Sequence, residues 1–530
     1  MADRFWRGGT AAWDGTAGTK WADTVGGAGG ASVPTSADDV FFDATSGVVT
    51  CTISGSQQAA SINCTGFTGT LAGTGSVTVS GSVTLVAGMG FTNQGTFTIN
   101  GTGTFTSAGK TIGGSSTGGL VVSGAGITVT LGSDLTLGST VGNTFINLTL
   151  TQGTLALNGF TVICSRFSSS NSNTRAIAFG STNIQVRGTG VLVSMANATG
   201  FTCTGTGGFA RVVSLSGTSE FTFGSTSGGS ASNAPNLTAT STGNTLTLTN
   251  GSYFKNVSFT GSTSTVTGTY NACGDLTLGS GGTYTSVVPT FLASGTITSA
   301  GRELGSTTVN GSGITVTLAD AITLGTAGTL TLTQGTFTTA NFNVTAGSFS
   351  SSNSNTRTLN MGSGTWTLTA NSPTVWNTGT TTGLTFAPST STISMTNVGT
   401  KGFIGGELTY YNLNQGGAGA LTISGSNTFN NITNSVQPAT VTFSSGTTQT
   451  VANFGLSGTA GNLITINSTA SGTQFTLSKA SGTVTAQYLA IQDSNATGGA
   501  TWDALSPTNT NLGNNTGWVF PSSGAFMMFF

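Results

Sequence analysis

Acidic side chains are the groups in this sequence that could do chemistry, and they are scarce. The chain has 530 residues, with 14 Asp and Glu, 13 Lys and Arg and no histidine. A glycan-cleaving site needs two carboxylates that lie close together. The candidates are isolated in sequence, so only the stacking of neighbouring turns could join two of them: Asp134, Glu220, Asp275, Glu303, Asp320 and Glu407. We therefore expect no catalytic residues and a non-enzymatic protein, with glycan cleavage as the alternative.

Metal ligands and reactive thiols are equally few. Asp38, Asp39 and Asp43 form the one acidic cluster, and calcium favours such oxygens, but no EF-hand or glycine–aspartate repeat surrounds them. A solvated loop is the expectation there. The five cysteines match no zinc-binding spacing, and we expect buried thiols in small core positions: Cys51, Cys64, Cys164, Cys203 and Cys273. The sequence thus predicts no metal and no cofactor.

One polar segment occurs twice and is a candidate repeated surface loop. FSSSNSNTR at 167–175 recurs at 349–357. Its amides and guanidinium could bind a sugar at two places, and the candidate side chains are Asn171, Asn173, Arg175, Asn353, Asn355 and Arg357. The alternative is a polar turn whose Asn and Ser stack between neighbouring turns.

Charge and hydropathy exclude several classes of partner. The net charge is −1 and the basic residues are scattered, whereas nucleic-acid binding needs clustered Lys and Arg. There is no apolar run of the length that spans a bilayer as a helix. The opening MADRFWRGGTAAWDG has no apolar stretch after its charges, so we expect no secretory signal and synthesis in a cytoplasm.

The elements that must position these groups are short β-strands. In GITVTL at 126–131, Ile127, Val129 and Leu131 alternate with threonines, and this period of two predicts a strand with one buried face. Similar runs end in Gly, Asn or Ser, which suit tight turns, and no segment keeps a helical period. The pattern predicts an all-β protein, a parallel β-helix (β-solenoid) with distinct N- and C-terminal capping segments. An array of β-sandwiches is the rival, but it would show linkers between units.

An internal duplication supports the repeat architecture. GITVTL recurs at 313–318, and LTLTQGT at 148–154 recurs at 330–336. The two copies span about 105–190 and 297–370. The acids are not kept between the copies, since Asp134 aligns with Ala321 and Ser133 with Asp320. We infer that a building unit was duplicated, without a charged site.

The two ends differ from the middle. Residues 1–45 hold Trp6, Trp13 and Trp21, and FWRGGT at 5–10 with these later tryptophans resembles the W-x-G-G…W…W opening of bacteriophage structural β-helix proteins and bacterial adhesin-like proteins. Residues 438–520 contain QDSNATGGATW and GNNTGW, which resemble a C-terminal β-helix module of the same proteins. The resemblance covers the two ends and implies an N-terminal cap or attachment segment at 1–45, with a simple hydrophobic lid as the alternative, and a C-terminal β-helix module at 438–520. The repeat pattern places the β-solenoid between them, at 46–437.

The last ten residues are strongly apolar. Residues 521–530 read PSSGAFMMFF, and an exposed run of this kind is adhesive. We expect it to dock into a partner subunit or a neighbouring copy, and folding back onto the last turn is the alternative. The candidate docking residues are Phe526, Met527, Met528, Phe529 and Phe530.

Together these features and the resemblance indicate a non-enzymatic structural protein of a bacteriophage virion. A tail fibre, spike or surface appendage fits, made in the host cytoplasm and built as a homo-oligomer. Its expected partners are other copies, other virion proteins and a host-surface glycan or receptor, with no nucleic acid and no membrane insertion. The alternatives are a bacterial surface adhesin or extracellular filament subunit, and a tailspike glycan depolymerase.

Overall fold

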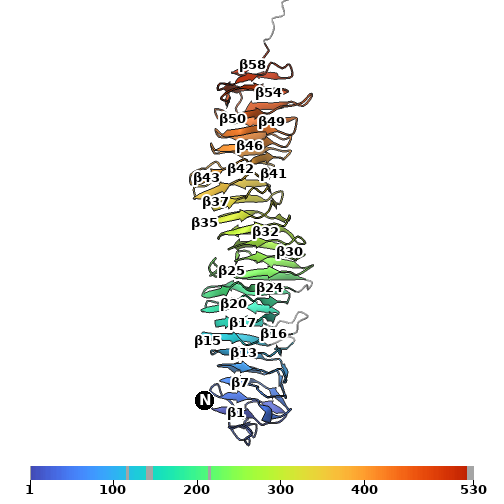
Figure 1. Cartoon of the computed structure of the whole chain (residues 1–530), viewed down its shortest axis with the longest axis vertical. Helices are drawn as coiled ribbons and strands as arrows, with labels where there is room; N and C mark the ends of the chain where they lie inside the picture. Colours follow the sequence, from blue (N-terminus) through green and yellow to red (C-terminus); the bar gives the residue numbers. More distant parts are fainter. Residues whose placement is uncertain (1, 115–117, 139–146, 213–216, 522–530) are drawn as a thin grey trace, which may run out of the picture. The chain divides into compact units, whose positions relative to one another are not determined.

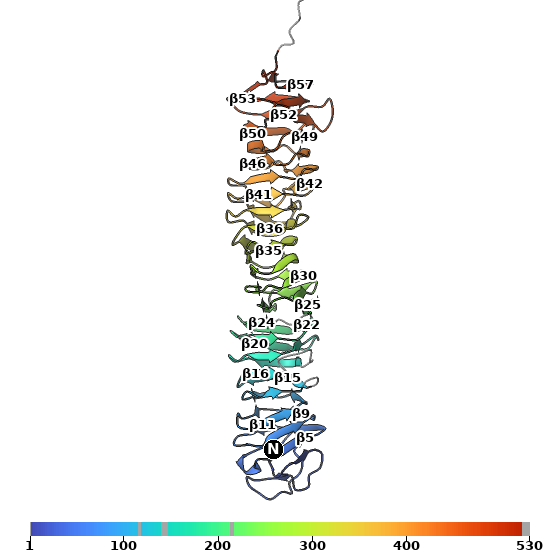
Figure 2. The ribbon, with the colours of Figure 1, turned by 90° about the vertical axis from the view of Figure 1, so that its right-hand side faces the viewer.

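The protein is an all-β parallel solenoid, as the sequence predicts. The computed structural model describes residues 2–114, 118–138, 147–212 and 217–521. About 54% of the chain is in strands, which stack in parallel into about 21 turns. Among the described residues the helical content is a single 3-10 turn, η1 (Ala44–Ser46). The chain divides into two compact units, Met1–Thr283 and Tyr284–Phe530, and Figures 1 and 2 show the strands stacked within each.

The first unit is built from strands that pair with the strand one turn further along the chain. Those that position the features below are β1 (Asp3–Trp6), β3 (Trp21–Ala22), β4 (Asp39–Phe41), β13 (Gly103–Thr106), β15 (Gly119–Leu131), β17 (Asn147–Ala156), β19 (Arg166–Ser168), β20 (Arg175–Gly180), β22 (Gly190–Asn197), β23 (Phe201–Gly205), β25 (Thr218–Ser227), β26 (Asn236–Ala239) and β27 (Thr245–Leu248).

Parallel register stacks like residues on like along the inside of this unit. Leu148 pairs with Phe167, which pairs with Val193, and the column continues through Phe221 to Leu248. All five are at most 1% exposed. Each contributes about 1.5–3 kcal/mol by leaving water, and no turn could bury them alone. The inward apolar stripe of the sequence is therefore the core.

The second unit follows the same plan. Its relevant strands are β33 (Gly295–Thr298), β35 (Thr307–Leu318), β37 (Thr329–Thr338), β39 (Ser348–Ser350), β40 (Arg357–Asn360), β42 (Ser372–Asn377), β45 (Lys401–Ile404), β46 (Thr409–Gln415), β47 (Leu421–Ser424), β48 (Thr428–Asn434), β50 (Thr448–Gly455), β52 (Phe475–Ser478), β54 (Leu489–Gln492), β55 (Ser494–Thr497), β56 (Thr501–Asp503), β57 (Thr510–Gly513) and β58 (Trp518–Val519). Its inner column contains Phe349, Trp376, Phe403 and Ile423.

The duplicated segments adopt the same local structure, one in each unit. β15 pairs with β17 and β35 with β37, and in both pairs the register shifts at the same place: Ser123 opposes Gln152, and Asn310 opposes Gln334. The strands that follow, β19 with β20 and β39 with β40, pair onto β17 and β37 in the same way. The duplication therefore copied a structural building block, including its irregularity.

Candidate functional site

The three N-terminal tryptophans form the centre of a buried aromatic cluster. Trp6, Trp13 and Trp21 are each 0% exposed. The Trp21 ring lies edge-on to Trp6 at 5.0 Å and to Trp13 at 5.4 Å, and Phe42 packs against all three. β3 runs antiparallel to β1, so the chain folds back over its own first strand. These side chains cap the core, and an attachment role stays a prediction for the surface around them.

The acidic cluster supports this cap with hydrogen bonds. Asp38 is only 7% exposed, so the expectation of a solvated loop is wrong for it. Its carboxylate accepts from the Thr35 amide at 2.9 Å and hydroxyl at 2.7 Å. Asp43 caps η1 by accepting from the amides of Thr45 and Ser46. Burial opposes ionisation of both carboxyls. The hydrogen bonds from Thr35 outweigh it at Asp38, and those from the Thr45 hydroxyl and from Arg7 outweigh it at Asp43, so the pKa of each carboxyl is lowered.

Arg175 of the repeated segment lies in the core, at 1% exposure. Its guanidinium donates to four backbone carbonyls: Ser169 at 2.6 Å, Asn173 at 2.8 Å, Thr199 at 2.7 Å and Asn197 at 2.7 Å. These carbonyls belong to two successive turns. The guanidinium thus clamps one turn to the next, because its planar fork presents donors in several fixed directions.

Arg357 makes the same clamp in the second unit. It is 1% exposed and donates to the carbonyls of Ser351 at 2.7 Å, Asn355 at 2.9 Å, Thr382 at 2.8 Å and Thr380 at 2.5 Å. The prediction that the two arginines lie on a surface loop is therefore wrong. Their guanidinium groups are buried and donate to backbone carbonyls, so they are not accessible to a sugar.

A glycine completes each clamp. The amides of Arg175 and Arg357 donate to the carbonyls of Gly200 at 3.0 Å and Gly383 at 2.9 Å. These glycines have φ of 72° and 71°, and an added Cβ would lie 2.8 Å or less from a carbonyl oxygen of the turn below. Both the left-handed backbone and the close approach require glycine.

The repeated asparagines stack turns, as the alternative interpretation proposes. Asn171 and Asn353 each accept, through Oδ1, from the amide two residues on, at 2.8 and 2.9 Å. Asn173 and Asn355 each donate from Nδ2 at 3.1 Å to a threonine carbonyl of the preceding turn. Asn173 and Asn355 are exposed, while Asn171 and Asn353 are half-buried. Four of the six predicted residues thus remain near the surface, with their amides engaged in turns.

Three of the candidate acids accept hydrogen bonds from a neighbouring turn. Asp134 Oδ1 accepts from the Thr161 amide at 2.8 Å. Asp320 accepts from the amides of Ser299 and Ala300, each at 2.7 Å. Glu220 accepts from the Thr249 hydroxyl at 2.7 Å. Each carboxylate is bound to a neighbouring turn, and no group of three His, Cys, Asp or Glu side chains within the described ranges could hold a metal ion.

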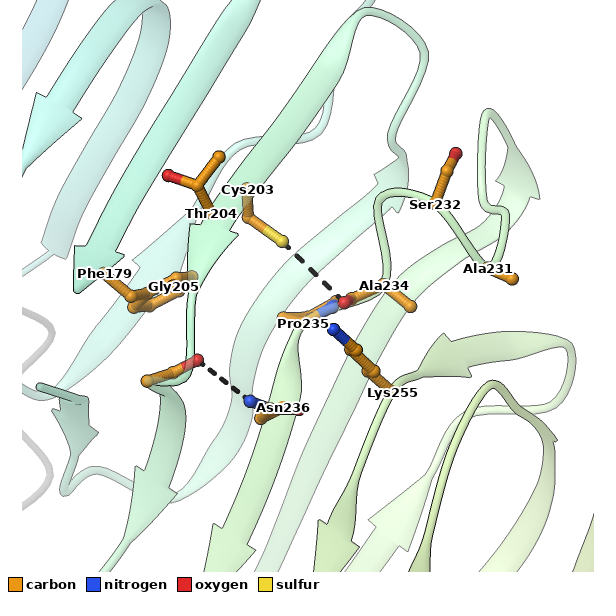
Figure 3. Close-up of a pocket in the computed structure, with 11 residues that line it drawn as sticks. Phe179, Cys203, Thr204, Gly205, Ala231, Ser232, Ala234, Pro235, Asn236 and Lys255 are labelled. Atoms are coloured by element: carbon orange, nitrogen blue, oxygen red, sulfur yellow. Dashed lines mark hydrogen bonds between the residues drawn. The ribbon is translucent and has the colours of Figure 1, made fainter. Parts of the chain in front are cut away.

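A cavity of about 260 Å³ opens in the first unit beside Cys203, and Figure 3 shows it. The Cys203 thiol points to the carbonyls of Asn233 and Ala234, at 3.4 and 3.7 Å, and Lys255 lies across the cavity. Burial raises the pKa of this thiol to about 11, and the charge of Lys255 lowers it only in part. The thiol is therefore protonated at neutral pH and is a poor nucleophile.

The other cysteines are buried free thiols, as predicted. Cys51, Cys64, Cys164 and Cys273 are buried, whereas Cys203 is half-buried. Burial raises the pKa of all four, to about 12 for Cys164 and Cys273. They fill small positions in the core of the first unit.

A shallow groove of about 410 Å³ on the second unit was not found by sequence reasoning. It crosses β46, β48 and β50, and its lining includes Pro388, Tyr411, Asn430 and Ala452 but no charged side chain. Beside it runs a ladder of amides: Asn431 donates to Asn412 at 2.5 Å, and Asn453 donates to Asn431 at 2.8 Å. Only the in-register pairing of successive turns brings these residues together, so no local sequence motif predicts the groove.

The two C-terminal motifs bind one another across adjacent turns. Asp493 of QDSNATGGATW is 2% exposed and accepts from Asn514 Nδ2 at 2.6 Å. Ser494 accepts from Trp518 Nε1 at 3.0 Å. The Trp518 ring lies 5.0 Å from Trp502, at 65°. The motif residues therefore hold the last turns together.

The predicted docking residues Phe526, Met527, Met528, Phe529 and Phe530 lie outside the described residues. No helix in the described part of the chain is long and apolar enough to cross a membrane. Comparisons with protein-family models, with curated proteins and with solved structures give no match.

Proposed function

We propose that the chain is a non-enzymatic structural component of a bacteriophage virion, a solenoid scaffold within a tail fibre, spike or other surface appendage. One observation carries the proposal: the end segments that resemble virion β-helix modules are held by tightly bonded motif residues. Trp21 sits at the centre of the N-terminal aromatic cluster, and Asp493 bonds Asn514 at the other end. Other copies of the chain and other virion proteins are the proposed partners.

The use of the polar groups also favours a scaffold. Arg175 and Arg357 are saturated by backbone carbonyls, and the carboxylate of Asp320 is bonded to two backbone amides. A general acid or nucleophile has to present a free oxygen to its substrate. These side chains bind the backbone of neighbouring turns instead, which favours a role as a stiff scaffold.

Mass spectrometry of purified virions tests the proposal. Peptides of this chain should be present in particles banded on a density gradient, at a constant ratio to the major capsid protein. Immunogold labelling should then place the chain on an appendage. Recovery from the bacterial envelope with none in particles would reject a virion role and favour the adhesin or filament subunit.

A second candidate role, binding of a neutral glycan, is favoured by the groove on the second unit. Tyr411 offers a ring face for stacking on a sugar, and the amide ladder from Asn412 to Asn453 offers donors and acceptors without charge. A Tyr411→Ala variant should lose retention on a glycan array, while Tyr488→Ala serves as a control outside the groove. Release of new reducing ends from the bound glycan, abolished by one Asp→Asn change, would instead establish a depolymerase.

A further inference from the structure

The outer face of the first two turns carries two carboxylates and two phenyl rings side by side. β1 pairs in parallel with β4, so Asp3 lies opposite Asp39 and Phe5 lies opposite Phe41. Side chains two positions apart along a strand point to the same side of the sheet. The acids and the rings therefore form two adjacent rows on one face, at the end of the first unit where Figure 1 labels β1.

The same two rows continue into the next turns without acids or rings. β7 (Ser61–Asn63) pairs with β4, and β10 (Val83–Thr84) pairs with β7. Asp39 and Phe41 lie opposite Ser61 and Asn63, and Asn63 lies opposite Thr84. Hydroxyls and amides are sufficient for a face that meets only water, so the acids and phenyl rings of the first two turns indicate a different use.

A shallow pocket of about 460 Å³ opens beside the rings, and its lining includes Phe5, Phe41, Val25, Asp3 and Asp43. The two rings are stacked, with centroids 4.7 Å apart and planes at 15°. Phe5 is buried, Phe41 is half-buried and Val25 is 64% exposed. An apolar surface rimmed by polar side chains is typical of an interaction site.

The acids beside this pocket have no cation. Residues 1–45 hold six acidic and three basic side chains. All three basic side chains are already in ion pairs: Arg4 with Asp23, Arg7 with Asp43 and Lys20 with Asp14. Within the described residues neither Asp3 nor Asp39 forms an ion pair, and Asp39 accepts only from the Ser61 hydroxyl, at 2.5 Å. Like charges opposite one another on a sheet repel, so a cation between them relieves this repulsion.

We propose that this face of β1 and β4 docks an extended basic segment of a partner protein, in which a Lys or Arg stands two residues from an apolar side chain. The cation lies between Asp3 and Asp39, and the apolar side chain enters the pocket beside Phe41 and Val25. Alternate side chains of an extended segment are roughly 7 Å apart, which is also the separation of Asp39 and Phe41 along β4. Complementary charge orients the segment, and apolar burial holds it. The inference is independent of whether the protein belongs to a virion.

Binding of labelled pentapeptides to the full-length protein, followed by fluorescence anisotropy, tests this chemistry. Thr-Lys-Thr-Phe-Thr should bind saturably, and its affinity should fall as salt is added, because salt screens exposed charges. Replacing Lys by Glu should weaken binding at least about tenfold, because like charges then face each other. Thr-Thr-Lys-Phe-Thr places the two side chains on opposite sides of the chain and should also bind more weakly. Equal binding of the three peptides, or no saturable binding of the first, would overturn the proposal.

Variants of the protein show whether the peptide binds at this face. Asp3→Asn should weaken binding of Thr-Lys-Thr-Phe-Thr about two- to fivefold, as expected for an exposed ion pair. Phe41→Asn installs the residue that the next turn carries at the same place and should weaken binding about tenfold. Glu303→Gln removes an exposed acid from the second unit and should leave binding unchanged.

Hydrogen exchange of the β7 amides in each variant shows that the stacked turns are intact. If Asp3→Asn and Phe41→Asn are both folded and both bind the peptide as the wild type does, the proposal is wrong. This result would leave the mass spectrometry of virions untouched, because the peptide titration uses the purified chain alone.

Discussion

Asp320 and Ser133 occupy equivalent places in the two copies of the duplication, and each accepts hydrogen bonds from two successive backbone amides of the preceding turn. Ser133 Oγ accepts from the amides of Ser107 and Ala108, at 2.9 and 3.1 Å. Asp320 accepts from Ser299 and Ala300 in the second copy, each at 2.7 Å. A carboxylate in one copy thus replaces a hydroxyl in the other. The acid serves a turn, and its absence from the first copy removes no site.

This equivalence predicts that Asp320→Ser is tolerated and Asp320→Ala is not. The alanine variant leaves two amides without an acceptor and should cost about 1–3 kcal/mol in local stability, while the serine variant should cost less than half of that. Exchange of the Ser299 and Ala300 amides measures both. Equal effects of the two substitutions would contradict the shared role.

The arginine clamps should be among the most sensitive positions. Arg357→Met keeps the apolar stem but strips the donors from four carbonyls, of which that of Ser351 is buried and the other three are partly buried, and we expect a loss of about 2–4 kcal/mol. Asn355→Ala, at an exposed neighbour, is the matched control and should cost about 1 kcal/mol or less. Denaturant unfolding of the second unit provides the measurement. A neutral Arg357→Met would mean that water replaces the guanidinium.

Lys401 gives the second unit a pH dependence. It is 0% exposed, and Nζ donates to the carbonyls of Asn397 at 2.6 Å and Gly419 at 2.8 Å. Burial lowers its pKa from 10.5 to about 8. The unfolded chain therefore holds more protons between these values, and the contribution of Lys401 to stability rises with pH from about 8 to 10.5, by about 3 kcal/mol.

The difference in the free energy of unfolding between wild type and Lys401→Met isolates the contribution of Lys401. Other groups titrate in the same window, but they are common to both proteins. The wild type should gain stability relative to Lys401→Met as pH rises from 8 to 10. A difference that is flat across this window would mean that the carbonyls keep the pKa of Lys401 near its ordinary value.

The buried cysteines should make the first unit less stable as pH rises, which is opposite to the effect of Lys401 in the second unit. Their folded pKa values are raised, for example to about 12 in Cys164, so the neutral thiol is favoured in the fold. The stability they supply is complete below the unfolded value near 8.5 and is lost as pH rises above it. Cys164→Ala should therefore reduce the loss of first-unit stability at alkaline pH. Exchange rates of first-unit amides from pH 8 to 10 check the sign.

Removing Trp21 should open the N-terminal cap. Trp21→Ala leaves a cavity against Trp6 and Trp13 and should cost about 3–5 kcal/mol. Val25→Ala, at a side chain 64% exposed, is the control. Indole fluorescence of the remaining tryptophans should shift to the red in Trp21→Ala alone. An unshifted spectrum would mean that the cluster does not depend on Trp21.

The sequence by itself determined the architecture, because the information is local. Alternation in Ile127, Val129 and Leu131 requires a strand with one buried face, and their burial at 9%, 0% and 0% follows. The duplication is likewise visible in the letters, and it reappears as the shared register shift of β15 and β35. Motif strings at both ends marked the residues that later prove to be bonded.

Only the tertiary structure decided what the polar groups do. Arg175 and Arg357 looked like surface residues because their neighbours are Ser and Asn, yet the stacking of turns surrounds each guanidinium with carbonyls from the next turn. The groove beside Tyr411 depends on the register of β46, β48 and β50. Which residue of the next turn faces a given side chain depends on the lengths of the corners between the two strands. No local sequence pattern shows which residues that register brings together.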